Sequence, residues 1–500
     1  FLILSRGLRT KISATSPSAK IDKDMTHLKS WRDIPGPSTL PLIGQAHHFL
    51  PGGEFHNLSM NNIWEKMYEK YGPISKFQLA LTPPTILLTD PDIIQQVYHA
   101  ENSMPRRAGF FSIDYYRRHY KKTKREPPLV GLVTDYGEQW KNLRSMVNPI
   151  LLQPNVIISY SNAVNDIARD MVQRLKSLRN ENNMIQDFDS HIKLWALESI
   201  AFIATGCHIK CYDENEKENS LARRLPKLLD EVLGEETIFI DFVMPFVWKY
   251  LPNGKIKTCE KFLKVLNYFR IIEHFISLGI EELKKNGDIN DGEKSVLEKL
   301  LNKDEEVALV MTSDMIVGGS HSVSHTLISI LYQLAINQDK QQKLRESLTS
   351  NEPKIYLKAC IKEALRLLPL STENSRILTK DHNILGYKVP KDAVIINYHN
   401  KLISDENQYP RPGKFIPERW IVGKEDPLHH GNAHPFASLP FGFGVRSCIG
   451  RRIAELELET ILYHLIENLS VEWNGPPPVV KRTHLNVLQG LCFVLNDVKM

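Results

Sequence analysis

Apolar residues recur with the 3.6-residue period of an α-helix over most of 130–370, and a second helical run covers about 449–467. Short segments with a β-type pattern flank this region, and the tail after Pro476 is irregular or β. The predicted strands are 74–79, 85–89, 375–378, 387–389 and 394–397. The pattern predicts a mainly α fold, a large helical body with small β-sheets, rather than a βαβ series. No break in composition divides residues 31–500, so we expect one domain there.

The first 30 residues have a composition unlike that of the body. Basic residues and Ser/Thr are frequent, and no acidic residue precedes Asp22. This is typical of a mitochondrial presequence, so we expect 1–30 to be a leader, incomplete at its N-terminus because the chain begins with Phe1. The alternative is the remnant of a lost membrane anchor, which would place the protein at the endoplasmic reticulum. A stiff Pro- and Gly-rich hinge at 34–38 separates the leader from the body.

Charge and cysteine content narrow the function classes. The formal net charge is only +5 over 500 residues, too weak to indicate a nucleic-acid partner. The most basic stretch, 117–125, precedes two prolines, and we expect a solvated loop there. The six cysteines are scattered without the spacing of a disulfide framework, which favours a reducing compartment.

The strongest chemical signal is the segment 441–450, which reads FGFGVRSCIG. Its glycines permit positive φ and let the backbone approach a flat cofactor. Cys448 directly precedes a predicted amphipathic helix, whose free N–H groups and dipole favour a thiolate. Arg446 lies two residues before it and can pair with an anionic group such as a propionate. The segment therefore predicts a cysteine that binds a metal or cofactor.

This segment resembles the haem-binding signature of the cytochrome P450 family. The matching residues are Phe441, Gly442, Gly444, Arg446, Cys448, Gly450 and Ala454. The resemblance implies the cytochrome P450 fold around a buried haem b (iron protoporphyrin IX), with Cys448 as the iron ligand. It also implies monooxygenase activity, in which one oxygen atom of O₂ enters the substrate.

Other matches follow in the order that the family has them. Glu363 and Arg366 resemble its Glu-x-x-Arg helix, and Arg419 resembles the arginine that completes a structural Glu-Arg-Arg cluster. Three further residues resemble haem-propionate ligands. They are Trp140 and Arg144, four residues apart on one predicted helix, and Arg376 after the Glu-x-x-Arg helix.

A predicted helix over 311–331 carries Gly318, Gly319, His321 and Ser322 where the family usually has glycine, an acid and a threonine. We expect the glycines to provide a gap or kink for dioxygen. His321 replaces the acid and Ser322 the threonine, and both are candidates for delivering protons to bound oxygen. The substitution also leaves open a haem-thiolate isomerase or dehydratase that needs no external electrons, or a haem-holding protein without turnover.

Two basic pairs resemble the mitochondrial class, and the run 136–154 resembles its arthropod members. The pairs are Lys358 with Lys362, and Arg451 with Arg452. The resemblance implies docking of an acidic, adrenodoxin-like ferredoxin, supplied by its NADPH reductase, and a place on the matrix side of the inner membrane with peripheral membrane contact.

The resemblance also implies a lipophilic small-molecule substrate, steroid-like or xenobiotic. By analogy, Met315, the stretch 370–372 and Val487 are candidate pocket residues.

Overall fold

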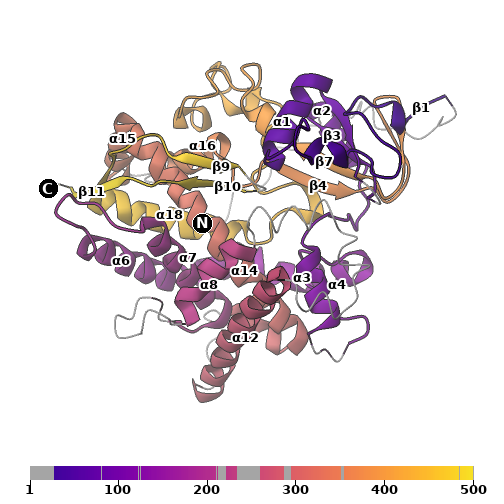
Figure 1. Ribbon diagram of the computed structural model, residues 1–500. Coiled ribbons are helices and arrows are strands. Elements are labelled where there is room, and N and C mark those ends of the chain that lie inside the picture. The colour runs from indigo at the N-terminus through magenta and orange to yellow at the C-terminus, as the bar shows by residue number, and fades with distance from the viewer. Residues whose placement is uncertain are drawn as a thin grey trace, which may run out of the picture.

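Long helices make up most of the molecule, and its strands lie in small sheets toward two of its edges (Figure 1). The computed structural model describes residues 27–79, 82–121, 123, 125–209, 211, 221–232, 260–286, 294–350, 354–482 and 485–498. The helices are α1 Met60–Tyr71, α2 Pro91–His99, α3 Phe111–His119, α4 Gly137–Leu151, α5 Pro154–Ile158, α6 Ser161–Ser177, α7 Phe188–Thr205, α8 Leu221–Val232, α12 Glu260–Asn286, α13 Val296–Leu301, α14 Glu305–Ile336, α15 Gln338–Leu348, α16 Lys354–Leu367, α17 Asn400–Ile403 and α18 Arg451–Asn468. The strands are β1 Lys29–Ser30, β2 Ile74–Phe77, β3 Thr85–Leu88, β4 Glu373–Ile377, β5 His382–Ile384, β6 Tyr387–Val389, β7 Val394–Tyr398, β8 Leu469–Trp473, β9 Val479–Arg482, β10 Asn486–Gln489 and β11 Phe493–Asp497. The mainly α fold predicted from the apolar period is confirmed.

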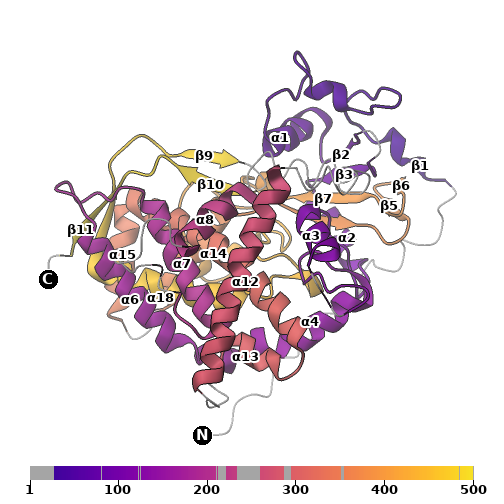
Figure 2. The same ribbon diagram turned by 60° about the horizontal axis from the view of Figure 1, so that its bottom comes forward.

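Helix α14 passes through the middle of the helical part and packs along α7, while α12 crosses in front of it (Figure 2). Asp304 caps its N-terminus by accepting a hydrogen bond from the Val307 N–H. Most of its residues are buried, as expected of a helix that is apolar on nearly every side. It is longer at both ends than the 311–331 predicted from the sequence. The Cβ of any larger residue at Gly319 would lie 2.5 Å from Ile200 of α7, so this glycine allows the two helices to approach closely.

A four-stranded sheet lies at the opposite end of the molecule from α6 and α15 (Figure 1). Its strand order is β2-β3-β7-β4, with β3 and β7 parallel and the outer pairs antiparallel. Helices α1 and α2 lie beside this sheet, and Asp90 caps the start of α2 by accepting a hydrogen bond from the Ile93 N–H. Strand β4 follows α16 directly, and this link brings Arg376 toward the cysteine segment.

The basic stretch 117–125 is not simply a solvated loop. Arg117 and Arg118 lie in α3, and Arg117 is only 2% exposed. Its Nη1 is 2.6 Å from Asp314 of α14 and also donates to the Val130 carbonyl. The local pattern around Arg117 does not indicate this pairing, because Asp314 lies 197 residues away in the chain.

Most of the predicted leader, residues 1–26, lies outside the described residues. Among the helices that the structure describes, none is long and apolar enough to cross a membrane.

Candidate active site

The segment that carries Cys448 is a tight loop held by its own backbone. Gly442 and Gly444 both have φ of +69°, a left-handed conformation that favours glycine. The Cys448 N–H donates to the Phe441 carbonyl at 2.8 Å and closes the loop. Helix α18 begins at Arg451, three residues after Cys448, as its amphipathic pattern predicted. The loop thereby presents the cysteine at a helix N-terminus.

Cys448 retains accessible surface and lines an internal cavity of about 370 Å³. Gly318 and Ser322 of α14 line the same cavity, together with Met315 and Leu370. Burial raises the pKa of the Cys448 thiol, while the Gly450 N–H and the charges of nearby arginines act in the opposite direction. The fold thus brings the cysteine loop and α14 to the wall of one cavity that Cys448 also lines.

Three arginines and a tryptophan line this cavity. Arg446 is 2% exposed and donates to the carbonyls of Pro105, Leu132 and Asp135 at 2.7–3.0 Å. Its guanidinium lies 3.8 Å from the ring centre of Trp140. Arg144 donates to the Ser447 carbonyl, but its Nε and the Trp140 Nε1 are buried without a hydrogen-bond partner.

The third arginine that lines the cavity, Arg107, was not predicted from the sequence. Its Nη2 donates to the Arg446 carbonyl, and burial followed by the charge of Arg376 lowers its pKa to about 10. Burial and the charges of Arg107 and Arg376 likewise lower the pKa of Arg446 to about 9. Arg107 stands in a Met-Pro-Arg-Arg run far from the cysteine, and nothing in that local pattern distinguishes it from a surface arginine.

Arg376 takes a different position from the one expected of a propionate ligand. It is buried and pairs with Glu101, and it is absent from the described lining of the cavity. Its charge nevertheless acts on both Arg107 and Arg446, so it adds to the positive potential around the cavity.

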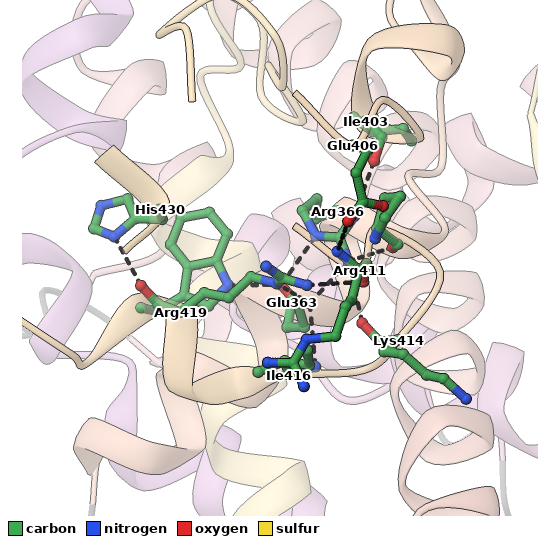
Figure 3. Close-up of polar contacts among 11 residues, drawn as sticks. Glu363, Arg366, Ile403, Glu406, Arg411, Lys414, Ile416, Arg419 and His430 are labelled. Atoms are coloured by element: carbon green, nitrogen blue, oxygen red, sulfur yellow. Dashed lines mark hydrogen bonds and ion pairs between the residues drawn. The ribbon is translucent and has the colours of Figure 1, made fainter. Parts of the chain in front are cut away.

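Glu363, Arg366 and Arg419 meet as one fully buried cluster (Figure 3). Oε1 of Glu363 accepts from Arg366 Nη2 at 2.8 Å and from Arg419 Nε at 3.1 Å, and the two carboxylate oxygens together accept five hydrogen bonds. Arg366 also donates to the carbonyls of Ile403 and Pro412. These bonds join α16 to the segment around 403–420, which leads into the loop.

Comparison with known proteins agrees with this arrangement. The family model for cytochrome P450 matches residues 34–490. The chain belongs to the cytochrome P450 family. It is 33% identical over 499 residues to cytochrome P450 CYP12A2 of Musca domestica, covering 94% of this chain and 91% of that protein. It is 32% identical over 485 residues to the probable cytochrome P450 12b2, mitochondrial, of Drosophila melanogaster, covering 92% and 88%. The resemblance to mitochondrial insect members is therefore confirmed, as is P450 monooxygenase activity.

Membership of the cytochrome P450 family implies a haem-thiolate cofactor, and the cavity suits one. Arg107, Arg144 and Arg446 line it, and neither acid of its described lining pairs with them. Asp314 already pairs with Arg117, and burial raises the pKa of Glu457 to about 8. An excess of buried positive charge with two unsatisfied N–H donors fits a dianion such as the two haem propionates.

On the P450 helix α14, Ser322 and His321 face different spaces. Ser322 lines the cavity, where its hydroxyl donates back to the Gly318 carbonyl at 2.7 Å. His321 is absent from that lining and lies in a second, polar pocket, 3.3 Å from Asp230. Thr326, one turn after Ser322, lines the cavity and was not singled out from the sequence. Helical geometry explains the split because successive residues point about 100° apart.

The two glycines of α14 also differ. A Cβ at Gly318 would meet nothing within 4 Å, which leaves open space on the cavity side. The space at the Cβ position of Gly319 is filled by Ile200. The helix continues without interruption through both glycines. Both glycines line the cavity, but only Gly318 has open space at its Cβ position, which is the gap expected from the sequence.

The basic residues expected to dock a partner surround a separate hollow. Lys358, Lys362 and Arg451 line this hollow of about 610 Å³, whereas Arg452 is exposed outside it. Phe441 and Gly442 of the cysteine loop line both this hollow and the cavity. Of the expected substrate residues, Met315 and Leu370 line the cavity, while Val487 lies in the second pocket.

Proposed function

We propose that Cys448 would hold haem b through its thiolate, and that this P450 hydroxylates a lipophilic substrate with electrons from an acidic ferredoxin. One observation carries this proposal: Cys448 and the Ser322 turn of α14 line a single cavity edged by arginines. Bound there, haem supplies the chemistry of O₂ activation, with a thiolate that favours O–O cleavage.

Arg144, Trp140, Arg446 and Arg107 are proposed to hold the propionates. The buried donors of Trp140 and Arg144 that lack partners support this assignment. Arg376 acts through its charge and through its pairing with Glu101 rather than by direct contact.

Ser322 is proposed to hold the proton that oxygen activation requires. Its hydroxyl lies at the cavity, and a change of side-chain rotamer would turn its donor from the Gly318 carbonyl toward the cavity. Thr326 is placed to extend a proton path along the same face of α14. His321 faces away, so we no longer expect it to meet bound oxygen directly.

Electrons are proposed to arrive at the hollow lined by Lys358, Lys362 and Arg451. Positive charge beside the cysteine loop favours docking of an acidic iron–sulfur protein and shortens the electron path. An NADPH-dependent reductase would in turn reduce that ferredoxin.

The basic, acid-poor composition of 1–30 and the mitochondrial relatives support import into mitochondria. We propose a place on the matrix side of the inner membrane, with peripheral membrane contact.

The substrate is proposed to be steroid-like or xenobiotic, because apolar side chains such as Met315, Leu370 and Ile200 line much of the cavity. Screening both classes for a spin-state shift of the purified holoenzyme tests this.

A reconstitution experiment tests the reaction. With an adrenodoxin-like ferredoxin, its reductase, NADPH and O₂, we expect one hydroxylated product per O₂ consumed. The reduced carbon-monoxide complex should show the thiolate-ligated band, and Cys448→Ala should lose it. Rearrangement of a peroxide without NADPH would instead indicate the isomerase or dehydratase, and a normal spectrum without any product a haem-holding protein.

A further inference from the structure

A second pocket lies beside α14, and it is lined largely by charged and polar side chains. Its volume is about 410 Å³, and its walls come from α7, α8, α14 and the β9–β10 segment. His321, His325, Asp230 and Lys193 face it. None of these four residues lines the cavity that holds Cys448, so the pocket is separate from the oxygen-activating site.

Two imidazoles and one carboxylate converge in this pocket. His321 and His325 are four residues apart on α14, which stacks their side chains on one helix face. Asp230 reaches them from α8, with its Oδ1 3.3 Å from His321 Nε2. One ligand atom from each of the three residues lies within 4.8 Å of the other two. Among the described residues, no other trio of His, Cys, Asp or Glu comes this close.

Several polar atoms of this trio lack a partner. Neither ring nitrogen of His325 has a hydrogen bond, although the residue is only 3% exposed. His321 is 8% exposed, and its Nδ1 has no partner either. Leaving such groups unsatisfied in a protein interior costs about 1–3 kcal/mol each. A ligand that accepts imidazole lone pairs would remove this cost.

We propose that Asp230, His321 and His325 form a binding site for a divalent transition-metal ion of the zinc type. Imidazole with one carboxylate is a ligand set that Zn²⁺ accepts, whereas Mg²⁺ and Ca²⁺ prefer oxygen ligands alone. Tetrahedral zinc sites place ligand atoms roughly 3.3 Å apart, so small side-chain rotations would close the trio. The pocket leaves room for water at the fourth position.

Lys193 sets the strength of this site. Its Nζ lies 2.8 Å from Asp230 Oδ2 and 3.0 Å from Asp189. The ammonium group competes with a metal ion for the Asp230 carboxylate, so binding is weaker than the ligand set alone would give. Removal of the Lys193 charge should therefore tighten metal binding. If the pair of Lys193 with Asp230 had only a structural role, its removal would not be expected to tighten metal binding.

The proposed ion joins two helices that border different spaces. His321 and His325 flank Ser322 on α14, and Asp230 belongs to α8, so a bound ion would tie α8 to the turn that lines the cavity. We expect zinc to raise the thermal unfolding midpoint of the holoenzyme for this reason.

Titration of chelator-treated holoenzyme with ZnCl₂ in a calorimeter tests the site, with Asp230→Asn and His325→Ala as variants. Wild type should bind one Zn²⁺ per chain, and each variant should bind more than about tenfold more weakly. Lys193→Gln should bind about tenfold more tightly. X-ray absorption at the zinc edge should show two imidazole ligands.

The double variant His47→Ala, His48→Ala is the matched control. It removes two imidazoles with ring centres 4.1 Å apart that lie far from this pocket in the chain, and it should leave the stoichiometric site intact. Asp230 is 37% exposed, so Asp230→Asn should keep its haem spectrum and fold. If wild type binds no stoichiometric zinc, or a folded Asp230→Asn binds it equally well, the proposal is wrong.

Discussion

Two buried groups of charge, one around Glu363 and one around the cavity of Cys448, differ in how their charges are balanced. Around Glu363, one carboxylate accepts five hydrogen bonds, two of them from Arg366 and one from Arg419. Around the cavity, Arg107 and Arg446 donate only to backbone carbonyls in the described contacts. The first group contains its own carboxylate, whereas no carboxylate accepts a hydrogen bond from Arg107 or Arg446 in the described contacts, and this excess of positive charge suits an anionic ligand. Buried arginines that share a carboxylate thus mark the structural group, and buried arginines without one mark the proposed binding site.

The largest expected effect comes from removing the carboxylate of the cluster formed by Glu363, Arg366 and Arg419. Glu363→Ala leaves Arg366 and Arg419 buried without their carboxylate, and we expect a loss of roughly 3–5 kcal/mol in the free energy of unfolding. Soluble yield and thermal unfolding measure this. Glu54→Ala, which removes an exposed pair with Lys70, is the control and should cost less than about 1 kcal/mol. Equal effects from the two changes would contradict the comparison.

A second buried glutamate, Glu457, differs from Glu363 because it has no arginine partner in the described contacts. Glu457 lines the cavity, no arginine or lysine of the described residues pairs with it, and burial raises its pKa to about 8 from an ordinary 4.5. Because the folded state holds this proton more tightly than the unfolded state, stability should fall as pH rises from about 4.5 through 8. Glu457→Gln should abolish this slope and stabilise the protein at pH 8 by roughly 2–4 kcal/mol. Thermal midpoints at pH 5.5 and 8 test it; an unchanged slope would show that the carboxyl is ionised.

The sequence predicted these regions unequally. Helical periodicity predicted the fold class and the start of α18 near 449, because both depend on local spacing. The order of the motifs predicted a site at Cys448 and a cluster that contains Glu363 and Arg419. It could not predict that Arg107 lines the cavity, nor that Arg117 pairs with Asp314, because these contacts depend on how distant segments pack.

The assignment of His321 shows a further limit. The motif placed it beside Ser322, but only the phase of α14 against α7 and α8 decides which of the two side chains faces the cavity. A helical wheel cannot supply that phase when nearly every face is buried.

Arg107→Gln should affect the free and haem-bound forms in opposite directions. Without haem, removal of one of several mutually repelling buried arginines should leave stability unchanged or raise it. With haem, loss of a propionate partner should weaken binding by about 10–100-fold. Thermal unfolding of the apoprotein and the rate of haem transfer to apomyoglobin measure the two effects. If the substitution destabilised both the apoprotein and the haem-bound form, Arg107 would have a structural role rather than a role in propionate binding.

Ser322→Ala should lower the product formed per NADPH by about tenfold or more, because the hydroxyl at the cavity would be lost. Ser320→Ala is a close control: Ser320 makes the same kind of bond to the helix, to Ile316 at 2.9 Å, but does not line the cavity. Hydrogen peroxide release should rise only in the first variant. If both variants lose coupling alike, the effect belongs to the helix and not to the hydroxyl.

The smallest effect should come from the exposed charges, which solvent screens and of which Lys358 already pairs with Glu459. Lys358→Gln with Lys362→Gln should weaken ferredoxin binding a few-fold, about 1 kcal/mol, and more at low salt than at high salt. Lys354→Gln changes an exposed lysine on the same helix that does not line the hollow, so it should have little effect. Apparent KM for ferredoxin at two ionic strengths separates these cases. Because the substitutions do not alter residues that line the cavity, haem content and the carbon-monoxide spectrum should not change. A loss of either would indicate that these lysines have a structural role rather than a role in docking.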